Sequence, residues 1–184
     1  MKINILELLE IQKEVNLVVK EKTKEDPSAE DYVLAFNVEL FEYFNAVGFW
    51  KWWKHNHQIN KEKVLDELAD CFAFFLSAVD YQDRNAEFEE KEIVSPKIND
   101  ELNEIFINLQ NFKLKSEMSN EEIIVDLIKY IGTDNEDNGI ITIERFAIAI
   151  FIATILFEEI TWEEITEAYR KKSDVNIQRQ RENY

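Results

Sequence analysis

Two pairs of acidic residues lie at helical spacing within segments that are otherwise apolar. Glu39 and Glu42 are three residues apart, and so are Glu67 and Asp70. In an α-helix this spacing places both carboxylates of a pair on one face, one turn apart. Because a carboxylate in apolar surroundings is costly unless something neutralises it, the two pairs predict a site for a bound cation.

Four carboxylates offer the hard oxygen ligands that Mg²⁺ prefers. Two antiparallel helices would bring the pairs together, and because Mg²⁺ usually takes only one or two protein carboxylates, four acids can serve more than one ion. The alternative is that both pairs are ordinary solvated helix faces, as most such pairs must be in a chain with 38 acidic residues. Their occurrence on successive amphipathic segments favours the metal site.

The C-terminal segment 170–184 is rich in basic residues, although the chain has a net charge of -17. Within it Lys172, Asn176 and Arg179 lie four and three residues apart and form one stripe if the segment is helical. Such a stripe can bind phosphate, with the guanidinium acting as a fork and the ammonium as a point charge. The alternative is that these cations only complement the dipole at a helix C-terminus.

Three other features are interpreted without chemistry. His55 and His57 have a spacing seen in metal sites, but no Cys or third His is near, which favours a solvated pair. Residues 134–145 resemble a calcium loop, yet Arg145 stands at the twelfth position, where a bidentate Glu is required. Cys71 lies in an apolar run and is expected to be a buried hydrophobe.

The elements that must position these residues are predicted to be helices, so the fold class is all-α. Apolar residues recur at helical spacing, and a chain with three Gly and two Pro favours long helices over turn-rich sheets. Residues 83–100 are polar and are expected to form the main connector. Helices are predicted over roughly 3–22, 27–48, 61–82, 98–115, 120–131, 143–157 and 162–182.

Three helix starts carry a local signal. Pro27 suits the first turn of the second predicted helix. Ser119 with Glu122, and Thr161 with Glu164, have the spacing of a capping box.

Composition narrows the class of protein. The net charge of -17 disfavours binding to nucleic acid, whose phosphates need clustered basic residues. No apolar run reaches the roughly 18 to 20 residues needed to span a membrane, and the first residues lack the apolar region of a signal peptide. A cytoplasmic protein with no membrane partner is expected, and 184 residues favour one domain.

Three segments, 38–54, 64–77 and 168–184, resemble the dimeric all-α dUTP diphosphatases of phages, bacteria and kinetoplastids, within the MazG-like nucleotide pyrophosphatases. The resemblance implies a helical bundle of the all-α NTP pyrophosphatase type. In it residues 1–84 and 143–184 would form the core bundle with the acidic site, and 85–142 a second helical segment able to move as a subdomain. It also implies a homodimer that hydrolyses dUTP, with dUDP as a second candidate substrate, to dUMP and pyrophosphate.

The resemblance further assigns roles to three groups of residues. The ligands of Mg²⁺, with more than one ion per site, would be Glu39, Glu42, Glu67 and Asp70, and Glu42 would also activate the attacking water. The phosphate-binding residues would be Lys172, Asn176, Arg179 and Tyr184. The residues that contact the nucleoside would be Gln12, Asn16, Trp53 and Lys54. The sequence departs from the family pattern at Ala46, Ala73, Ser173 and Asn183, where Glu, His, Asn and Gly are common.

Two other functions stay open on the sequence. One is a MazG-like pyrophosphatase that acts on a different nucleoside triphosphate. The other is a phage-type dimeric interaction or regulatory protein in which catalysis is secondary. A glutamine at position 42 or 67 separates the interaction protein from a metal enzyme, because an interaction protein would keep its activity whereas the enzyme would lose turnover and bind Mg²⁺ more weakly.

Overall fold

The computed structural model describes residues 1–54, 58–133, 139–157 and 160–182, and over these residues the chain is all-α, as predicted. His55, His57, residues 134–138 of the calcium-like segment and Tyr184 lie outside the described residues. The described part forms seven helices and no strand: α1 Leu6–Thr23, α2 Ala29–Val47, α3 Lys61–Phe88, α4 Ser95–Lys115, α5 Asn120–Thr133, α6 Gly139–Leu156 and α7 Trp162–Arg181.

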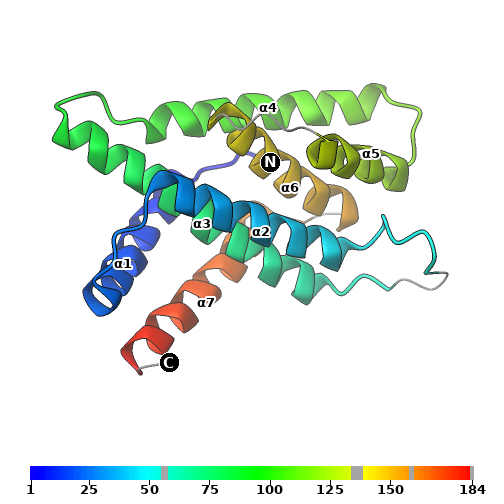
Figure 1. Cartoon of the computed structure of the whole chain (residues 1–184). Helices are drawn as coiled ribbons and strands as arrows, with labels where there is room; N and C mark the ends of the chain where they lie inside the picture. The colour runs from blue at the N-terminus through cyan, green and yellow to red at the C-terminus, as the bar shows by residue number, and fades with distance from the viewer. Residues whose placement is uncertain (55–57, 134–138, 158–159, 183–184) are drawn as a thin grey trace.

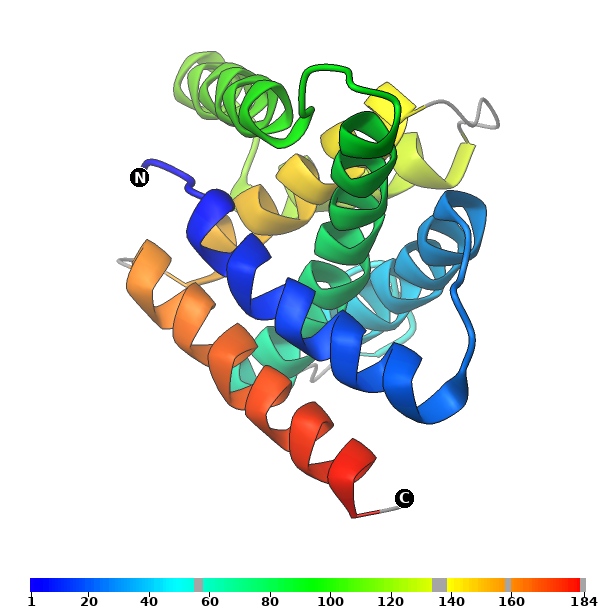
Figure 2. The same ribbon diagram turned by 90° about the vertical axis from the view of Figure 1, so that its left-hand side faces the viewer.

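The helices surround α3, which is the longest and contacts α1, α2, α6 and α7. Figure 1 shows α2 lying along the N-terminal half of α3, with α4 and α5 forming a layer on the opposite side of α6. In Figure 2, α1 and α7 lie side by side and both cross α3. This arrangement places the acidic segments of α2 and α3 next to each other and brings the basic C-terminal helix against α3.

Aromatic rings from four helices form the centre of the core. Phe75 of α3 stacks on Phe146 of α6 with ring centroids 4.1 Å apart, and Phe72 meets Phe146 edge-on at 4.6 Å. Tyr43 of α2 is fully buried and its hydroxyl donates a hydrogen bond of 2.9 Å to the Ala149 carbonyl. Such pairs add specific geometry to the burial of large apolar surfaces, so α2, α3 and α6 are held in a fixed relation.

Cys71 is buried in this core, as predicted. Burial raises the pKa of its thiol well above the usual value, and the nearby carboxylates of Glu39 and Asp70 raise it further. A thiol with a raised pKa is a poor nucleophile, which agrees with a structural role.

Capping explains where the helices begin. The side chains of Thr161 and Glu164 form the predicted box at the start of α7, and those of Ser119 and Glu122 do so before α5. The prediction that Pro27 lies in the first turn of α2 is wrong. The helix begins after Ser28, which is its N-cap, because the Ser28 hydroxyl accepts from the backbone N–H of Asp31 while the Asp31 carboxylate accepts from that of Ser28.

The prediction that the connector begins at Asp83 is also wrong, since α3 continues to Phe88 and α4 already begins at Ser95. Asp83 is buried, and its carboxylate accepts hydrogen bonds from the backbone N–H groups of Val94 and Ser95, at 2.8 and 3.0 Å. A carboxylate is favourable at a helix N-terminus, where the first N–H groups lack partners within the helix. The polar residue that suggested a loop therefore joins α3 to α4.

The N-terminal segment ties α4 to the rest of the bundle. The backbone N–H groups of Ile3 and Ile5 donate to the side chains of Asn103 and Asn99, at 2.9 and 3.0 Å. The division of the single domain into a core and a subdomain at 85–142 stays a prediction. Among the described helices none combines the length and apolar character that crossing a bilayer requires.

Candidate active site

Three of the predicted metal ligands lie close together between α2 and α3. Glu39 on α2 and Glu67 and Asp70 on α3 each place a carboxylate oxygen within 4.8 Å of the others. All three side chains are partly buried. The packing of α2 along α3 brings Glu39 next to the acidic pair of α3.

The three acids are held in conditions that disfavour their charge. Burial raises the pKa of Glu39 to about 7, with further contributions from Asp70, Glu42 and Glu67. Burial and the neighbouring Glu42 likewise raise the pKa of Glu67. Repelling carboxylates in a partly dry site are stabilised by a proton or by a cation, so this group is a candidate site for a positive ligand.

The chemistry of these oxygen donors fits Mg²⁺. Carboxylates from two adjacent helices, partly open to solvent, leave room for the water molecules that Mg²⁺ keeps. The acids must be deprotonated to bind the ion, and a raised pKa means that bound protons would be released when it binds. Which ion the site takes is treated below as a proposal.

Glu42 lies one turn beyond Glu39 on α2 but does not belong to the tight group. Its side chain is exposed and lines a shallow hollow with Phe41, Lys63 and Glu67. Its charge still acts on the group, since it contributes to the raised pKa values of Glu39, Glu67 and Asp70. The structure therefore places Glu42 at the edge of the acidic site.

Lys172 of α7 joins the basic helix to the acidic site. Its Nζ donates to Asp70 Oδ2 at 2.7 Å and to Asp66 Oδ2 at 2.9 Å. Burial lowers the pKa of Lys172, but the hydrogen bonds to Asp70 and Asp66 outweigh it, and the pKa is raised. For Asp70 burial outweighs the lysine and the pKa of the acid is raised as well. The charge of Lys172 does not fully compensate the buried carboxylate.

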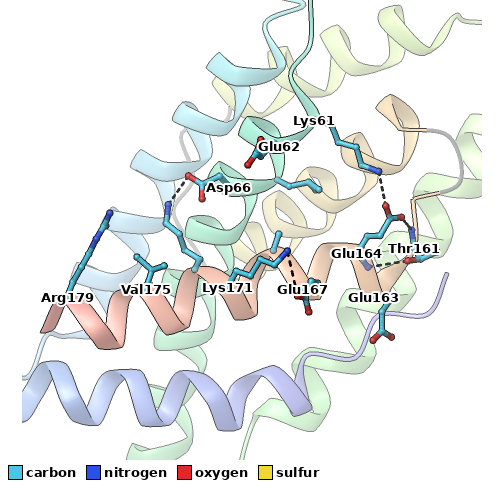
Figure 3. A pocket seen from close by; sticks show the side chains of 13 residues that line it. Lys61, Glu62, Asp66, Thr161, Glu163, Glu164, Glu167, Lys171, Val175 and Arg179 are labelled. Carbon is cyan, nitrogen blue, oxygen red and sulfur yellow. Dashed lines mark hydrogen bonds and ion pairs between the residues drawn. The ribbon is translucent and has the colours of Figure 1, made fainter. Parts of the chain in front are cut away.

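A groove of about 930 Å³ runs from this ion pair between α3 and α7. Figure 3 shows Arg179 and Val175 on α7 along this groove, with Asp66 on α3 opposite. Lys172 and Arg179 both line the groove, so the structure brings together two members of the predicted phosphate stripe. Asn176, the third, is half-buried and is not one of the lining residues.

The predicted nucleoside residues on α1 lie two turns further along α3. Gln12 is 3 % exposed, and its side chain donates to Asn16 Oδ1 and Ser77 Oγ. Asn16 is partly exposed and lines a separate cavity of about 420 Å³, together with Tyr32 and Asp80. Gln12 therefore acts from behind Asn16, which is the one open to a ligand.

The other two predicted nucleoside residues lie in the loop after α2. Trp53 is about half exposed, and its ring packs edge-on against Trp50 and Trp52, with centroids 5.4 and 5.7 Å apart. Lys54 is exposed. The ring contacts order the tryptophans relative to one another and leave Trp52 the most exposed of the three.

Sequence reasoning missed three polar residues of α3 that contact predicted site residues. Asp66 holds Lys172, and Ser77 and Asp80 hold Asn16. A signal was present, because Asp66 lies four residues before Asp70, and Ser77 and Asp80 lie seven and ten residues after it. These spacings extend one helical face beyond the acidic pair.

Comparisons with known proteins give a match over almost the whole chain. The sequence model of one protein family, described as dUTPase, matches residues 4–184. A search of curated proteins found no match.

Proposed function

The chain belongs to the dUTPase family, and from this membership, which carries dUTP diphosphatase activity, we propose how its residues perform the hydrolysis. The products are dUMP and pyrophosphate. The observation that carries the proposal is the tight acidic group of Glu39, Glu67 and Asp70, which adjoins Lys172 and the groove between α3 and α7. Neither the acidic group nor the basic side chains of α7 suffice alone. Acids without metal repel a triphosphate, and the lysine and arginine side chains do not activate water.

The acidic group holds Mg²⁺, with more than one ion once Glu42 contributes its carboxylate. When bound, the metal reverses the local charge, polarises a phosphoryl group and lowers the pKa of a coordinated water. The raised pKa values of Glu39, Glu67 and Asp70 support this role, since a bound cation would stabilise the ionised carboxylates.

Glu42 orients the attacking water and accepts its proton. Its position supports this role, because it lies at the solvent-exposed edge of the acidic site and not within the tight group. A base must reach the water within hydrogen-bond distance, directly or through one further water. Glu39, Glu67 and Asp70 are then left to bind metal.

Lys172 and Arg179 bind the phosphates along the groove, with Asn176 and Tyr184 completing the contacts. Lys172 makes two contacts to carboxylates, so it can leave Asp70 for a phosphate oxygen while Asp66 still holds it. Donors that are already in place where negative charge develops on the leaving pyrophosphate stabilise the transition state.

The nucleoside lies against α1, with Asn16 directed to the base and Gln12 behind it, while Trp53 and Lys54 line the entrance. The partly exposed amide of Asn16 beside the 420 Å³ cavity supports this placement. The spacing along α3 also agrees, since Ser77 and Asp80 lie about two and three turns beyond Asp70 on the same face.

The protein acts as a homodimer. The outer face of α2 supports this, because Leu34, Val38 and Phe41 are 66 %, 50 % and 56 % exposed, and contiguous apolar surface marks interaction sites. Phe41→Asp should convert a dimer into monomers in sedimentation velocity. A wild-type protein that sediments as a monomer at all concentrations would contradict the assignment.

A nucleotide panel tests the activity. The purified protein, stripped of metal and then supplied with Mg²⁺, is expected to release pyrophosphate from dUTP and to act on dUDP more slowly. Without metal, turnover should cease. Rapid turnover of another nucleoside triphosphate with dUTP left intact would favour the alternative of a MazG-like pyrophosphatase with a different substrate.

A further inference from the structure

Polar side chains from three helices form a buried hydrogen-bonded chain beside the 420 Å³ cavity. The Tyr169 hydroxyl on α7 donates to Gln12 Oε1 at 2.9 Å, and Gln12 Nε2 donates to Asn16 Oδ1 at 2.9 Å and to Ser77 Oγ at 3.0 Å. The Ser77 hydroxyl in turn lies 2.8 Å from Asn16 Oδ1. The chain ends at Asp80, whose Oδ2 accepts from Asn16 Nδ2 at 2.9 Å.

Asp80 determines the donor-to-acceptor direction of these hydrogen bonds. An ionised carboxylate can only accept hydrogen bonds, so the atom of Asn16 that faces it must be the amide nitrogen. The Asn16 oxygen then faces inward and accepts from Gln12 and Ser77. Because Asp80 is only 3 % exposed, no solvent competes for this contact.

A guanidinium lies beside Asp80 at ion-pair distance, without a hydrogen bond from its Nε. Arg84, one turn further along α3, has its Nε 3.3 Å from the same carboxylate oxygen that Asn16 contacts. Its other end lies 3.4 Å from Asp26, which precedes α2. Asp26 also pairs with Lys20, and within the described residues no hydrogen bond joins it to Asn16. It therefore shares the cavity and the guanidinium with Asp80 but has no part in orienting the amide.

The chain leaves one hydrogen-bond donor available for a ligand. Both N–H groups of the Gln12 amide are used inside the protein. Of the two N–H groups of Asn16, one binds Asp80, and the structure shows no contact for the other within the described residues. Asn16 is partly exposed and lines the cavity, so a ligand that reaches its amide meets a donor there and not an acceptor.

We propose that Asp80 is a positioning residue that sets the choice of base by holding the Asn16 amide with its donor toward the nucleotide. The inference rests on the proposed placement of the nucleoside against Asn16. The Asn16 N–H can donate a hydrogen bond to the carbonyl oxygen of a 4-oxo pyrimidine, whereas the amino group of a 4-amino pyrimidine would face it as a second donor. A buried polar group without a partner costs enough to discriminate between such bases.

Exchanging the residue types at positions 16 and 80 tests the direction of the hydrogen bonds without removing them. In the double variant Asn16→Asp with Asp80→Asn, the acid at 16 still accepts from Gln12, Ser77 and the new amide at 80, and the net charge is unchanged. The cavity then meets an acceptor. We expect kcat/KM for dUTP, relative to dCTP, to fall about 10- to 100-fold, with Tm close to that of the wild type. An unchanged ratio in the folded double variant would overturn the proposal.

Two further variants separate the possible failures. Asn16→Ala should reduce the preference for dUTP; if it does not, the nucleoside lies elsewhere and the proposed placement fails together with this inference. Asp80→Asn alone should raise KM for dUTP more than it lowers kcat, because the amide can then adopt either orientation. If Asn16→Ala reduces the preference while Asp80→Asn and the exchange do not, only the role of Asp80 is refuted.

A matched control addresses charge. Asp26→Asn removes one carboxylate from the same cavity and one partner of Arg84, yet it leaves Asn16 with its contacts. The ratio of kcat/KM for dUTP and dCTP should not change. An equal fall in Asp26→Asn and Asp80→Asn would mean that cavity charge, and not the orientation of the amide, sets the preference, and would overturn the proposal.

Discussion

One face of α3 carries polar residues at both ends, but their interactions differ. At its N-terminal end Glu67 and Asp70 join Glu39 in a group whose charges repel one another. Ten residues beyond Asp70, Asp80 belongs to a hydrogen-bonded group of side chains in which, within the described residues, the donors meet acceptors except for one N–H of Asn16. The acidic end is incomplete without a ligand, whereas the amide end is complete apart from the one N–H of Asn16 that a ligand can use.

This difference teaches what each end contributes to binding. A group of partly buried carboxylates stores unfavourable electrostatic energy that a cation relieves on binding. Side chains that are hydrogen-bonded to one another have their geometry fixed before the ligand binds, and they offer specificity instead of affinity. If the substrate lies as proposed, the bundle separates charge recognition at the phosphates from donor recognition at the base.

Removing one acid from the incomplete end should have the largest effect. Glu67→Gln is expected to lower kcat about 100-fold or more, because one metal ligand that stabilises the transition state is lost. Mg²⁺ affinity measured by calorimetry should fall as well. In the absence of metal the variant should be no less stable than the wild type, since a repelling charge has gone from the group.

Glu30→Gln is the control for this experiment, since it makes the same change at an exposed position in the first turn of α2. It should alter neither turnover nor Mg²⁺ affinity. If Glu67→Gln retains full turnover and Mg²⁺ affinity, the acidic pairs are solvated helix faces and the proposed metal site is wrong.

The sequence predicted the incomplete end better than the complete one, for a physical reason. Paired acids in an apolar helix stand out because they violate the expected pattern, so Glu39, Glu67 and Asp70 were identified from spacing alone. Ser77 and Asp80 look unremarkable in the sequence, since small and polar residues on a helix are common. Only the crossing of α1 over α3 shows that they meet Gln12 and Asn16.

The fold followed the same rule. Helical periodicity and capping boxes predicted the class and most of the helices, because both signals are local. The end of α3 was missed because Asp83 serves a distant segment, accepting hydrogen bonds from the start of α4. A side chain that acts across a turn cannot be distinguished from loop polarity by spacing.

Truncating the cationic stripe should have an intermediate effect. Arg179→Ala is expected to raise KM for dUTP about tenfold while it changes kcat less, because a charge-assisted contact to phosphate is lost. Arg181→Ala provides the matched control. Both arginines are exposed and lie in the last turn of α7, but Arg181 lines a different hollow, next to α1. Equal effects in the two variants would mean that the basic residues of the stripe only complement the helix dipole and do not bind phosphate.

The smallest effect is expected in the pH dependence of stability, and it sharpens the contrast between the two ends. Because the folded protein raises the pKa of Glu39 from 4.5 to about 7, the folded state binds this proton more tightly than the unfolded state does. Metal-free protein should therefore gain stability as pH falls from about 7 toward 4.5 and lose it again as pH rises. Thermal unfolding of the wild type and of Glu39→Gln, followed over this range, measures the difference in stability, which should be only a few degrees because Glu39 is partly exposed.

Saturating Mg²⁺ should stabilise the wild type more at the upper end of the pH range, where the Glu39 carboxyl is ionised. Parallel curves for the two proteins without metal would show that the acidic end carries no stored repulsion, and the contrast with the amide end would then be lost.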